Sequence, residues 1–144
     1  MKEITYGAIK PYFANNDKVI SYVKAMIKEA GLTIKESAFI NYTRADAQIH
    51  YAEHFRGSYE NAKGFYMELE DYITSDKVYG MIIEGEDAIA KLRSVIKVIR
   101  VEVPKMLNEE PRMTENVMHG SDKSESAEAE IALFKRLAKL NKTR

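Results

Sequence analysis

His119 is the residue of this chain whose neighbours most suggest chemistry. It opens the segment His119-Gly120-Ser121-Asp122, which lies between a β-prone run and a helical pattern. Gly120 lets the backbone turn sharply beside the imidazole, and the free N–H groups at the start of the following helix favour a phosphate. The segment is therefore consistent with a reactive histidine beside a phosphate. A histidine that only completes a structural hydrogen-bond network, or one exposed to water, is the alternative.

Two further side chains are placed to assist such a histidine. Glu130 lies on the helical pattern that follows, where it can turn back and orient the imidazole. Glu125 and Glu128 share that pattern, so a solvated acid is the alternative. Lys10 ends the first β-prone run, and a lysine on a mostly apolar strand is costly to bury unless it meets an anion. An exposed lysine at a sheet edge is the competing interpretation.

Arg93 and Phe65 are ambiguous in the same way. Arg93 follows Leu92 on a helical stripe, so it can clamp a phosphate through two parallel hydrogen bonds or simply extend to water. Phe65 begins the apolar stripe of its own predicted helix. It therefore either packs in the core or offers a ring on which a nucleobase stacks.

Composition narrows the class of protein. The chain has 144 residues, enough for one domain with its own core, and no cysteine, which excludes thiolate metal sites and thiol chemistry. Its 22 Lys and Arg balance 22 Asp and Glu, so we expect no bulk attraction to nucleic acid or anionic membrane, although a local basic pocket is compatible with this balance. No apolar run approaches the roughly 20 residues that span a bilayer, and the N-terminus lacks the apolar core of a signal peptide. We expect a soluble, cytoplasmic protein.

The first part of the chain predicts a strand, a helix and a second strand. Residues 4–9 form a short β-prone run that ends at Lys10-Pro11. Asn15, Asn16 and Asp17 supply helix-start chemistry, and an apolar stripe continues at helical spacing to Gly31. Between 32 and 42 the apolar residues fall on even positions, which is the period of a strand with one buried face.

The middle of the chain predicts two helices, a strand and another helix. Thr43 and Asp46 resemble a capping box at a helix start, and a second helical stripe covers 62–73. The apolar run 78–83 is typical of a central strand, and the spacing over 89–96 predicts a helix.

The remainder is less regular. Residues 100–115 contain two prolines and several charges, which predicts an irregular surface excursion with a strand-like piece at its start. Residues 116–119 form a strand candidate, and Asp122 with Glu125 fits an N-cap and an acid in the first turn of a helix. Residues 135–144 form a basic tail that we expect to fray.

In chain order these elements run β-α-β-α-α-β-α-β-α. The order allows an antiparallel four-stranded sheet with helices packed on it, an α+β sandwich of ferredoxin-like topology. We predict a single domain of this class over residues 1–144.

Taken together, these positions resemble the nucleoside diphosphate kinases over nearly the whole chain. The most specific piece is His119-Gly120-Ser121-Asp122 with Glu125-Ser126-Ala127-Glu128 and Glu130-Ile131, which is similar to the active-site signature of that family. The order of the other matching segments agrees as well: Ile9-Lys10-Pro11, His50-Tyr51-Ala52-Glu53, Phe65-Tyr66, Tyr72-Ile73-Thr74-Ser75, Glu84-Gly85, Arg93 and Asn116.

The resemblance implies an enzyme that passes the γ-phosphate of a nucleoside triphosphate to a nucleoside diphosphate through a phosphohistidine, in a ping-pong exchange. It assigns His119 as the nucleophile, Glu130 as the residue that orients it and Ser121 as a support. The residues that it implies for phosphate and ribose are Lys10, Tyr51, Arg93 and Asn116, and those for the base are Phe65 and Leu69. It also implies Mg²⁺ carried by the nucleotide phosphates, with no metal site of the protein's own, and a homo-oligomer, whether hexamer, tetramer or dimer.

The sequence departs from the family pattern in three places. Tyr12-Phe13 follows Lys10-Pro11 where the family usually has Asp-Gly, and the stretch before Phe65 is longer than the common pattern. The stretch after Arg93 is shorter, and the family's threonine and its Thr-Ile-Arg-Gly-Asp segment are not recognisable there. A phosphate-binding arginine is therefore unassigned. The candidates to replace it are Arg100, Lys105 and Arg112.

Two other classes of function stay open. One is a nucleotide-binding or partner-binding module of the same fold with weak or lost transferase activity, suggested by the altered segment after Arg93. The other is an RNA-recognition module, because Lys63-Gly64-Phe65-Tyr66 begins like its aromatic strand motif. Met67-Glu68 does not continue that motif, and the segment has helical spacing. We therefore expect nucleotides as partners, with no membrane and no specific nucleic acid.

Overall fold

The sheet of this protein has four antiparallel strands. The structure, a computed structural model, describes residues 2–50, 71–109 and 117–143. The strands are β1 (Lys2–Ile9), β2 (Thr33–Ile40), β3 (Val78–Glu86) and β4 (Met118–Gly120), in the spatial order β2-β3-β1-β4. The predicted α+β sandwich of ferredoxin-like class is confirmed. β4, which carries His119, lies at one edge of the sheet.

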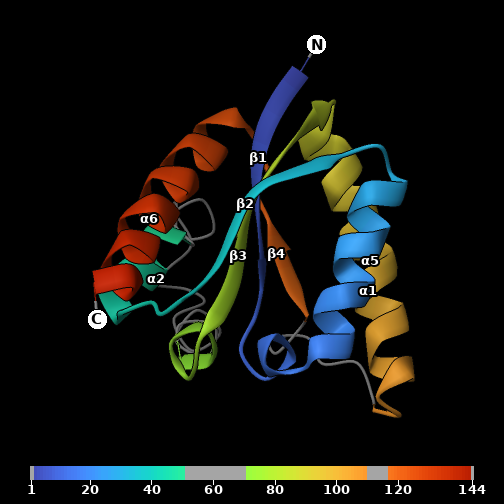
Figure 1. Cartoon of the computed structure of the whole chain (residues 1–144), viewed down its shortest axis with the longest axis horizontal. Helices are drawn as coiled ribbons and strands as arrows, with labels where there is room; N and C mark the ends of the chain where they lie inside the picture. The colour runs from blue at the N-terminus through green and yellow to red at the C-terminus, as the bar shows by residue number, and fades with distance from the viewer. Residues whose placement is uncertain (1, 51–70, 110–116, 144) are drawn as a thin grey trace, which may run out of the picture.

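Helices cover both faces of this sheet (Figure 1). α1 (Asp17–Glu29) and α5 (Ala88–Met106) lie on one face, and α2 (Arg44–His50) and α6 (Ser124–Thr143) lie on the other. A short 3₁₀ helix, η1 (Phe13–Asn15), connects β1 to α1. The helical stripe predicted over 62–73 is described from residue 71 onward, and residues 71–74 are helical.

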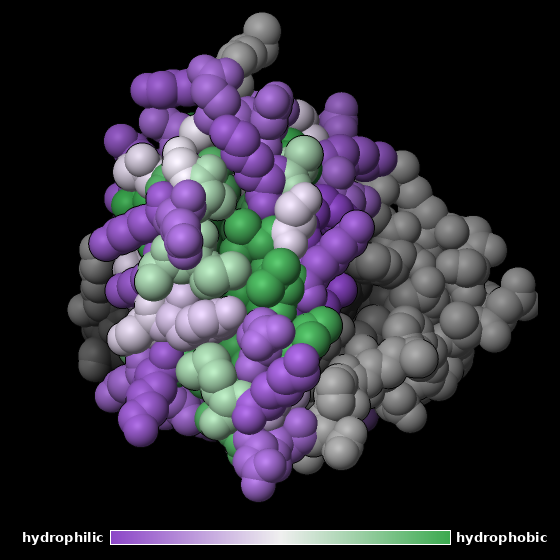
Figure 2. Space-filling view, turned by 90° about the vertical axis from the view of Figure 1, so that its right-hand side faces the viewer, coloured by the Kyte–Doolittle hydropathy of each residue, from purple (hydrophilic) through white to green (hydrophobic). Residues whose placement is uncertain are grey.

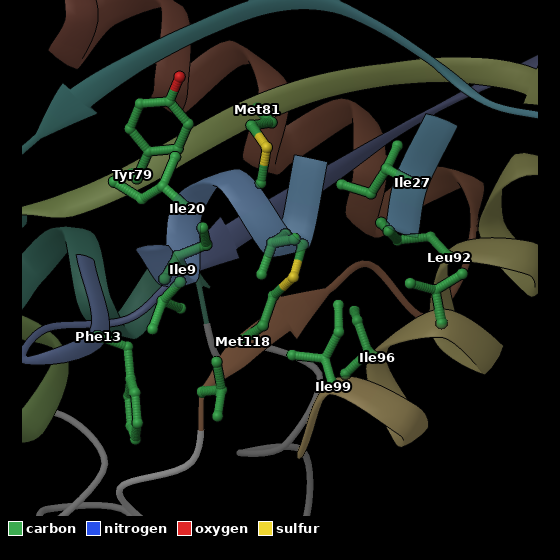
Figure 3. Close-up of a cluster of buried hydrophobic side chains, with 14 of the residues drawn as sticks. Ile9, Phe13, Ile20, Ile27, Tyr79, Met81, Leu92, Ile96, Ile99 and Met118 are labelled. Atoms are coloured by element: carbon green, nitrogen blue, oxygen red, sulfur yellow. The ribbon is translucent and has the colours of Figure 1, made fainter. Parts of the chain in front are cut away.

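Buried side chains of the described residues form two clusters, one on each face. The first lies between the sheet and helices α1 and α5, where Ile9, Met81, Leu92 and Met118 pack together (Figure 3). The second lies under α2 and α6, around Phe134. On the outer side of the α1 and α5 layer, hydrophobic surface gathers in the middle of a hydrophilic frame (Figure 2). The sheet is thus buried on both faces, and this packing fixes the position of the residues at its edge.

The helix starts predicted within 15–17 and at Thr43 are confirmed, and the structure selects Asn16 as the first cap. Asn16 Oδ1 accepts hydrogen bonds from the backbone N–H groups of Lys18 at 2.9 Å and Val19 at 3.2 Å, which caps α1. Before α2, Thr43 Oγ1 accepts from the Asp46 N–H at 3.1 Å, and Asp46 Oδ2 accepts from the Thr43 N–H at 3.0 Å. This reciprocal pair is a capping box.

β2 is a strand, as its period of two predicts, but its apolar residues divide between the two faces. The pairing of β2 with β3 skips Lys35, which makes a bulge. An extra residue reverses the alternation of side chains beyond it. Ile34 consequently packs with the α1 and α5 cluster, whereas Ile40 belongs to the α2 and α6 cluster.

The prediction of an irregular segment over residues 100–115, with a strand-like piece at its start, is wrong for the part that the structure describes. α5 continues to Met106 with Pro104 inside it. The buried stripe of this helix runs on through Ile99 and Val103. Burial of that stripe therefore outweighs the hydrogen bond that a proline removes from a helix. Residues 110–115 of the predicted excursion lie outside the described residues.

α6 differs from its prediction at both ends. It begins at Ser124, so Lys123 rather than Asp122 occupies the position before the helix. The tail that we expected to fray is helical as far as Thr143. The physical reason is that Leu137 and Ala138 are buried in the cluster under this helix.

The two leucines near the end of α6 test this account. Leu137 is buried and Leu140 is 47% exposed. Leu137→Ala should lower the free energy of unfolding by about 2–5 kcal/mol, and Leu140→Ala, the same change about one turn later, should change it by less than about 1 kcal/mol. Urea unfolding of both variants measures the difference. Equal, small effects would mean that the tail does fray.

Candidate active site

His119 lies in the middle of β4 and is held from the opposite layer by a glutamate. Its side chain is 11% exposed, and its Nε2 makes a hydrogen bond to Oε1 of Glu130 on α6. Glu130 is itself 3% exposed, so this contact is shielded from water. When the carboxylate accepts the Nε2 proton, the lone pair of the neutral ring lies on Nδ1. The two residues that sequence reasoning paired are therefore brought together.

Lys10 is buried directly after β1. Ala8 of β1 pairs with His119, and the Lys10 N–H donates to the Val117 carbonyl at 2.9 Å. Lys10 and His119 are thus diagonal neighbours across the two chain segments. Burial, and then the positive charge of Arg100, lower the pKa of Lys10 from 10.5 to about 7.

Ser121 supports the strand that carries the histidine. Its N–H donates to the Tyr6 carbonyl at 3.1 Å, and its hydroxyl Oγ lies 3.4 Å from the same oxygen. The residue is 1% exposed. These contacts hold the end of β4 against β1 at the point where the chain leaves for α6.

Arg93 lies on the other layer of the fold from Glu130. It is exposed on α5 and lines a crevice with Ile96, Lys97, Arg100 and Gly120. It is therefore close to the histidine strand through Gly120, although it approaches from the opposite side of the sheet.

The three candidates for the missing arginine separate clearly. Arg100 Nη2 donates to the Met118 carbonyl at 3.2 Å, next to His119. Lys105 projects to solvent and pairs with Glu102 at 3.8 Å within α5. The residues of the predicted site that lie outside the described part of the chain are Arg112, Tyr51, Phe65, Leu69 and Asn116.

Lys97 is a site neighbour that sequence reasoning missed. It lines the same crevice as Arg93 and Arg100 because the three residues recur at i, i+4 and i+7 on α5. That spacing is visible in the sequence, but it has meaning only when the segment after residue 96 is helical. Pro104 signalled a break in the helix and concealed it.

The turn where the sequence departs from the family pattern is also unusual in the structure. Tyr12 has φ 73°, a backbone conformation that residues other than glycine rarely adopt. The Ala14 N–H donates to the Lys10 carbonyl at 2.9 Å, and the Tyr12 hydroxyl donates to Glu109. These contacts join the turn after Lys10 to the end of α5.

No group of three or more His, Cys, Asp or Glu side chains in the described ranges converges as metal ligands do. None of the helices there is long and apolar enough to cross a membrane.

Fold and site together define a class of protein: a ferredoxin-like α+β sandwich with a buried histidine on an edge strand, held by a glutamate and close to a buried lysine. Comparison with known proteins gives the family. The model of the family described as nucleoside diphosphate kinase matches residues 3–139. The chain belongs to the nucleoside diphosphate kinase family.

Individual relatives agree with this assignment. The nucleoside diphosphate kinase of Sorangium cellulosum is 36% identical over 138 residues, which cover 92% of this chain and 90% of that protein. The structure of the Aquifex aeolicus nucleoside diphosphate kinase superposes with a TM-score of 0.72 at 26% identity, covering 93% of this chain and 95% of that one. The Halobacterium salinarum enzyme in complex with CDP gives 0.71 at 26% identity, covering 93% and 88%.

The lowered pKa of Lys10 predicts a pH-dependent stability. Between about pH 7 and pH 10.5 the unfolded chain binds a proton at Lys10 that the folded chain does not. The cost of burying Lys10 is therefore complete below about pH 7, and it disappears as the pH rises towards 10.5. Lys10→Met should raise the free energy of unfolding by up to about a few kcal/mol at neutral pH, with a smaller gain at higher pH. Urea unfolding over a pH series measures it, and Lys105→Met is the exposed control. A gain independent of pH would contradict the account.

Proposed function

We propose that this chain transfers the γ-phosphate of a nucleoside triphosphate to a nucleoside diphosphate through a phosphohistidine on His119. The observation that carries the proposal is the buried contact between His119 Nε2 and Glu130, next to the buried Lys10. That contact presents Nδ1 as the nucleophilic atom, and neutral imidazole is nucleophilic near pH 7.

The first half-reaction forms one bond and breaks another. The Nδ1 lone pair of His119 bonds to the γ-phosphorus, and the bond from that phosphorus to the oxygen bridging the β-phosphate breaks. The electron pair of the broken bond leaves with the nucleoside diphosphate. The Nε2 proton stays in the hydrogen bond to Glu130, which stabilises the positive charge that develops on the ring.

The second half-reaction runs in the opposite sense. A terminal phosphate oxygen of another nucleoside diphosphate attacks the phosphorus, the phosphorus–nitrogen bond breaks, and its electron pair returns to Nδ1. Imidazole is regenerated as a new triphosphate leaves. Because the same groups surround the phosphorus in both directions, one site serves donor and acceptor in turn.

Positive charge around the moving phosphoryl group comes from Lys10 and Arg93. Burial takes water from Lys10, so an anionic phosphate beside it restores the charged form that burial disfavours. Arg93 can meet two phosphate oxygens with its guanidinium. Ser121 is a positioning residue, since its contacts go to the Tyr6 backbone.

The remaining site residues are proposed on the resemblance to the family. Tyr51 and Asn116 would contact phosphate or ribose, and Phe65 with Leu69 would hold the base. Stacking on an aromatic ring rather than reading the edge of the base tolerates every base. Such a site is suited to an enzyme that accepts nucleotides of all kinds.

We also propose Mg²⁺ as the cofactor, bound to the phosphate oxygens of the nucleotide. The described part of the site presents a histidine and cationic side chains around Lys10, and Mg²⁺ is commonly held by substrate phosphates with few protein ligands. Three further proposals rest on the resemblance alone. The chain forms one domain over residues 1–144, it acts in the cytoplasm, and it assembles as a homo-oligomer, whether hexamer, tetramer or dimer.

Phosphorylation of the protein itself tests the proposal. Incubation with ATP radiolabelled in its γ-phosphate should give an acid-labile, alkali-stable phosphoprotein that passes its label to an added diphosphate. His119→Ala should take up no label, whereas Lys105→Gln, a change at an exposed position of α5, should label normally. Equal labelling of His119→Ala would exclude this nucleophile. Nucleotide binding without labelling of the wild type would instead identify a binding module that has lost transfer.

Glu130→Gln tests the role of the buried contact. The amide keeps the shape of the side chain but loses the charge that faces the imidazole. A hydrogen bond to a charged group is worth about 1.5–3 kcal/mol, so the turnover number should fall roughly 10- to 100-fold with little change in KM for the nucleotide. Steady-state kinetics separate the two parameters. An unchanged turnover number would show that Glu130 acts only in packing.

A further inference from the structure

The crevice beside the open edge of β4 concentrates positive charge. It is lined by Arg93, Ile96, Lys97, Arg100 and Gly120. The three cations recur at i, i+4 and i+7, so they lie on one face of α5. No acidic residue lines this crevice within the described part of the chain. Although the net charge of the chain is zero, three positive side chains thus lie together next to the strand that carries His119.

The peptide groups of β4 that do not pair with β1 face this side. Its hydrogen bonds to β1 involve the Ser121 N–H and, at the other end, the Val117 carbonyl. Residues of an antiparallel strand bond alternately to either side, so the peptide groups of Met118 and Gly120 point to the open edge. The Met118 carbonyl receives Arg100 Nη2 there, at 3.2 Å.

Gly120 lets α5 approach this edge closely. A Cβ at position 120 would stand 2.5 Å from Cδ1 of Ile96, so that side chain would have to move to make room for it. The absence of a side chain at Gly120 therefore lets Ile96 of α5 pack directly against the strand that carries His119.

Acidic residues line the depression next to this crevice rather than the crevice itself. The neighbouring depression, which Arg93 and Lys97 also line, contains Glu3, Asp87 and Asp122. Arg100 does not line that depression, and its charge acts on Lys10 instead, whose pKa it lowers in addition to burial. Like charges held together repel, and an anion between them relieves the repulsion.

We propose that Lys97 and Arg100 bind the phosphate chain of the nucleotide and supply, from α5, the positive charge of the arginine that the sequence leaves unassigned. The proposal rests on the proposed function. Arg100 can bridge the Met118 carbonyl and a phosphate because a guanidinium carries five donors in a fixed plane. Lys97 adds a mobile point charge one turn earlier on the helix. In this proposal, the replacement cation expected after Arg93 comes from one face of a helix rather than from a loop.

Binding of inorganic tripolyphosphate and of ADP to charge-neutralised variants tests this proposal. Lys97→Gln and Arg100→Gln should each weaken both ligands, Arg100→Gln by about tenfold or more, and Arg100→Lys should restore part of the loss. Lys105→Gln, on the same helix but outside the crevice, is the matched control and should bind as the wild type does. Isothermal titration calorimetry at fixed salt measures the dissociation constants. Thermal unfolding checks that each variant is folded.

The outcomes separate this inference from the proposed function. Phosphotransfer by the wild type, with Lys97→Gln and Arg100→Gln both binding and turning over like Lys105→Gln, would overturn the role of the crevice and leave the function standing. Absence of a phosphoenzyme in the wild type, with tripolyphosphate binding that still depends on Lys97 and Arg100, would overturn the function and leave the crevice as an anion site. If Arg100→Gln does not fold, exposed Lys97 still decides the question.

Discussion

The antiparallel pairing of β1 with β4 is the interaction on which the site depends. It brings Lys10, at the end of β1, next to His119 on β4. β4 has only 3 residues, so its position relies on the bonds at its two ends, from Ser121 to Tyr6 and from Lys10 to Val117. The buried clusters on either face secure the register. A slip of one residue would turn the imidazole to the other face and away from α6.

Burial gives the polar groups of this site their chemistry. Glu130 and His119 are almost completely shielded, so their contact is undiluted by water and holds one ring orientation. Such a pair adds little net stability, because both groups lose hydration. Its value is in positioning. The same burial lowers the pKa of Lys10. The buried cation therefore lowers the stability of the fold, and it is in place to bind a phosphate.

Local signals in the sequence were reliable where the structure uses local contacts. The caps at Asn16 and Thr43 and the strand ending at Lys10-Pro11 follow from neighbours a few residues apart. They failed where distant residues decide. Pro104 and the basic character of the tail both predicted irregular chain, yet apolar stripes on α5 and α6 find partners in the core and keep the backbone helical.

The sequence by itself determined the kinds of group available, a histidine, an acid and a few cations, with no thiol, and the family signature around His119 that names their chemistry. Only the tertiary structure decided which groups meet. The bulge in β2 and the lowered pKa of Lys10 depend on residues far apart in the chain. Lys97 and Arg100 share a helix face only because the buried stripe of α5 keeps the chain helical past residue 96. Burial and charge act through space, so spacing along the chain could not assign them.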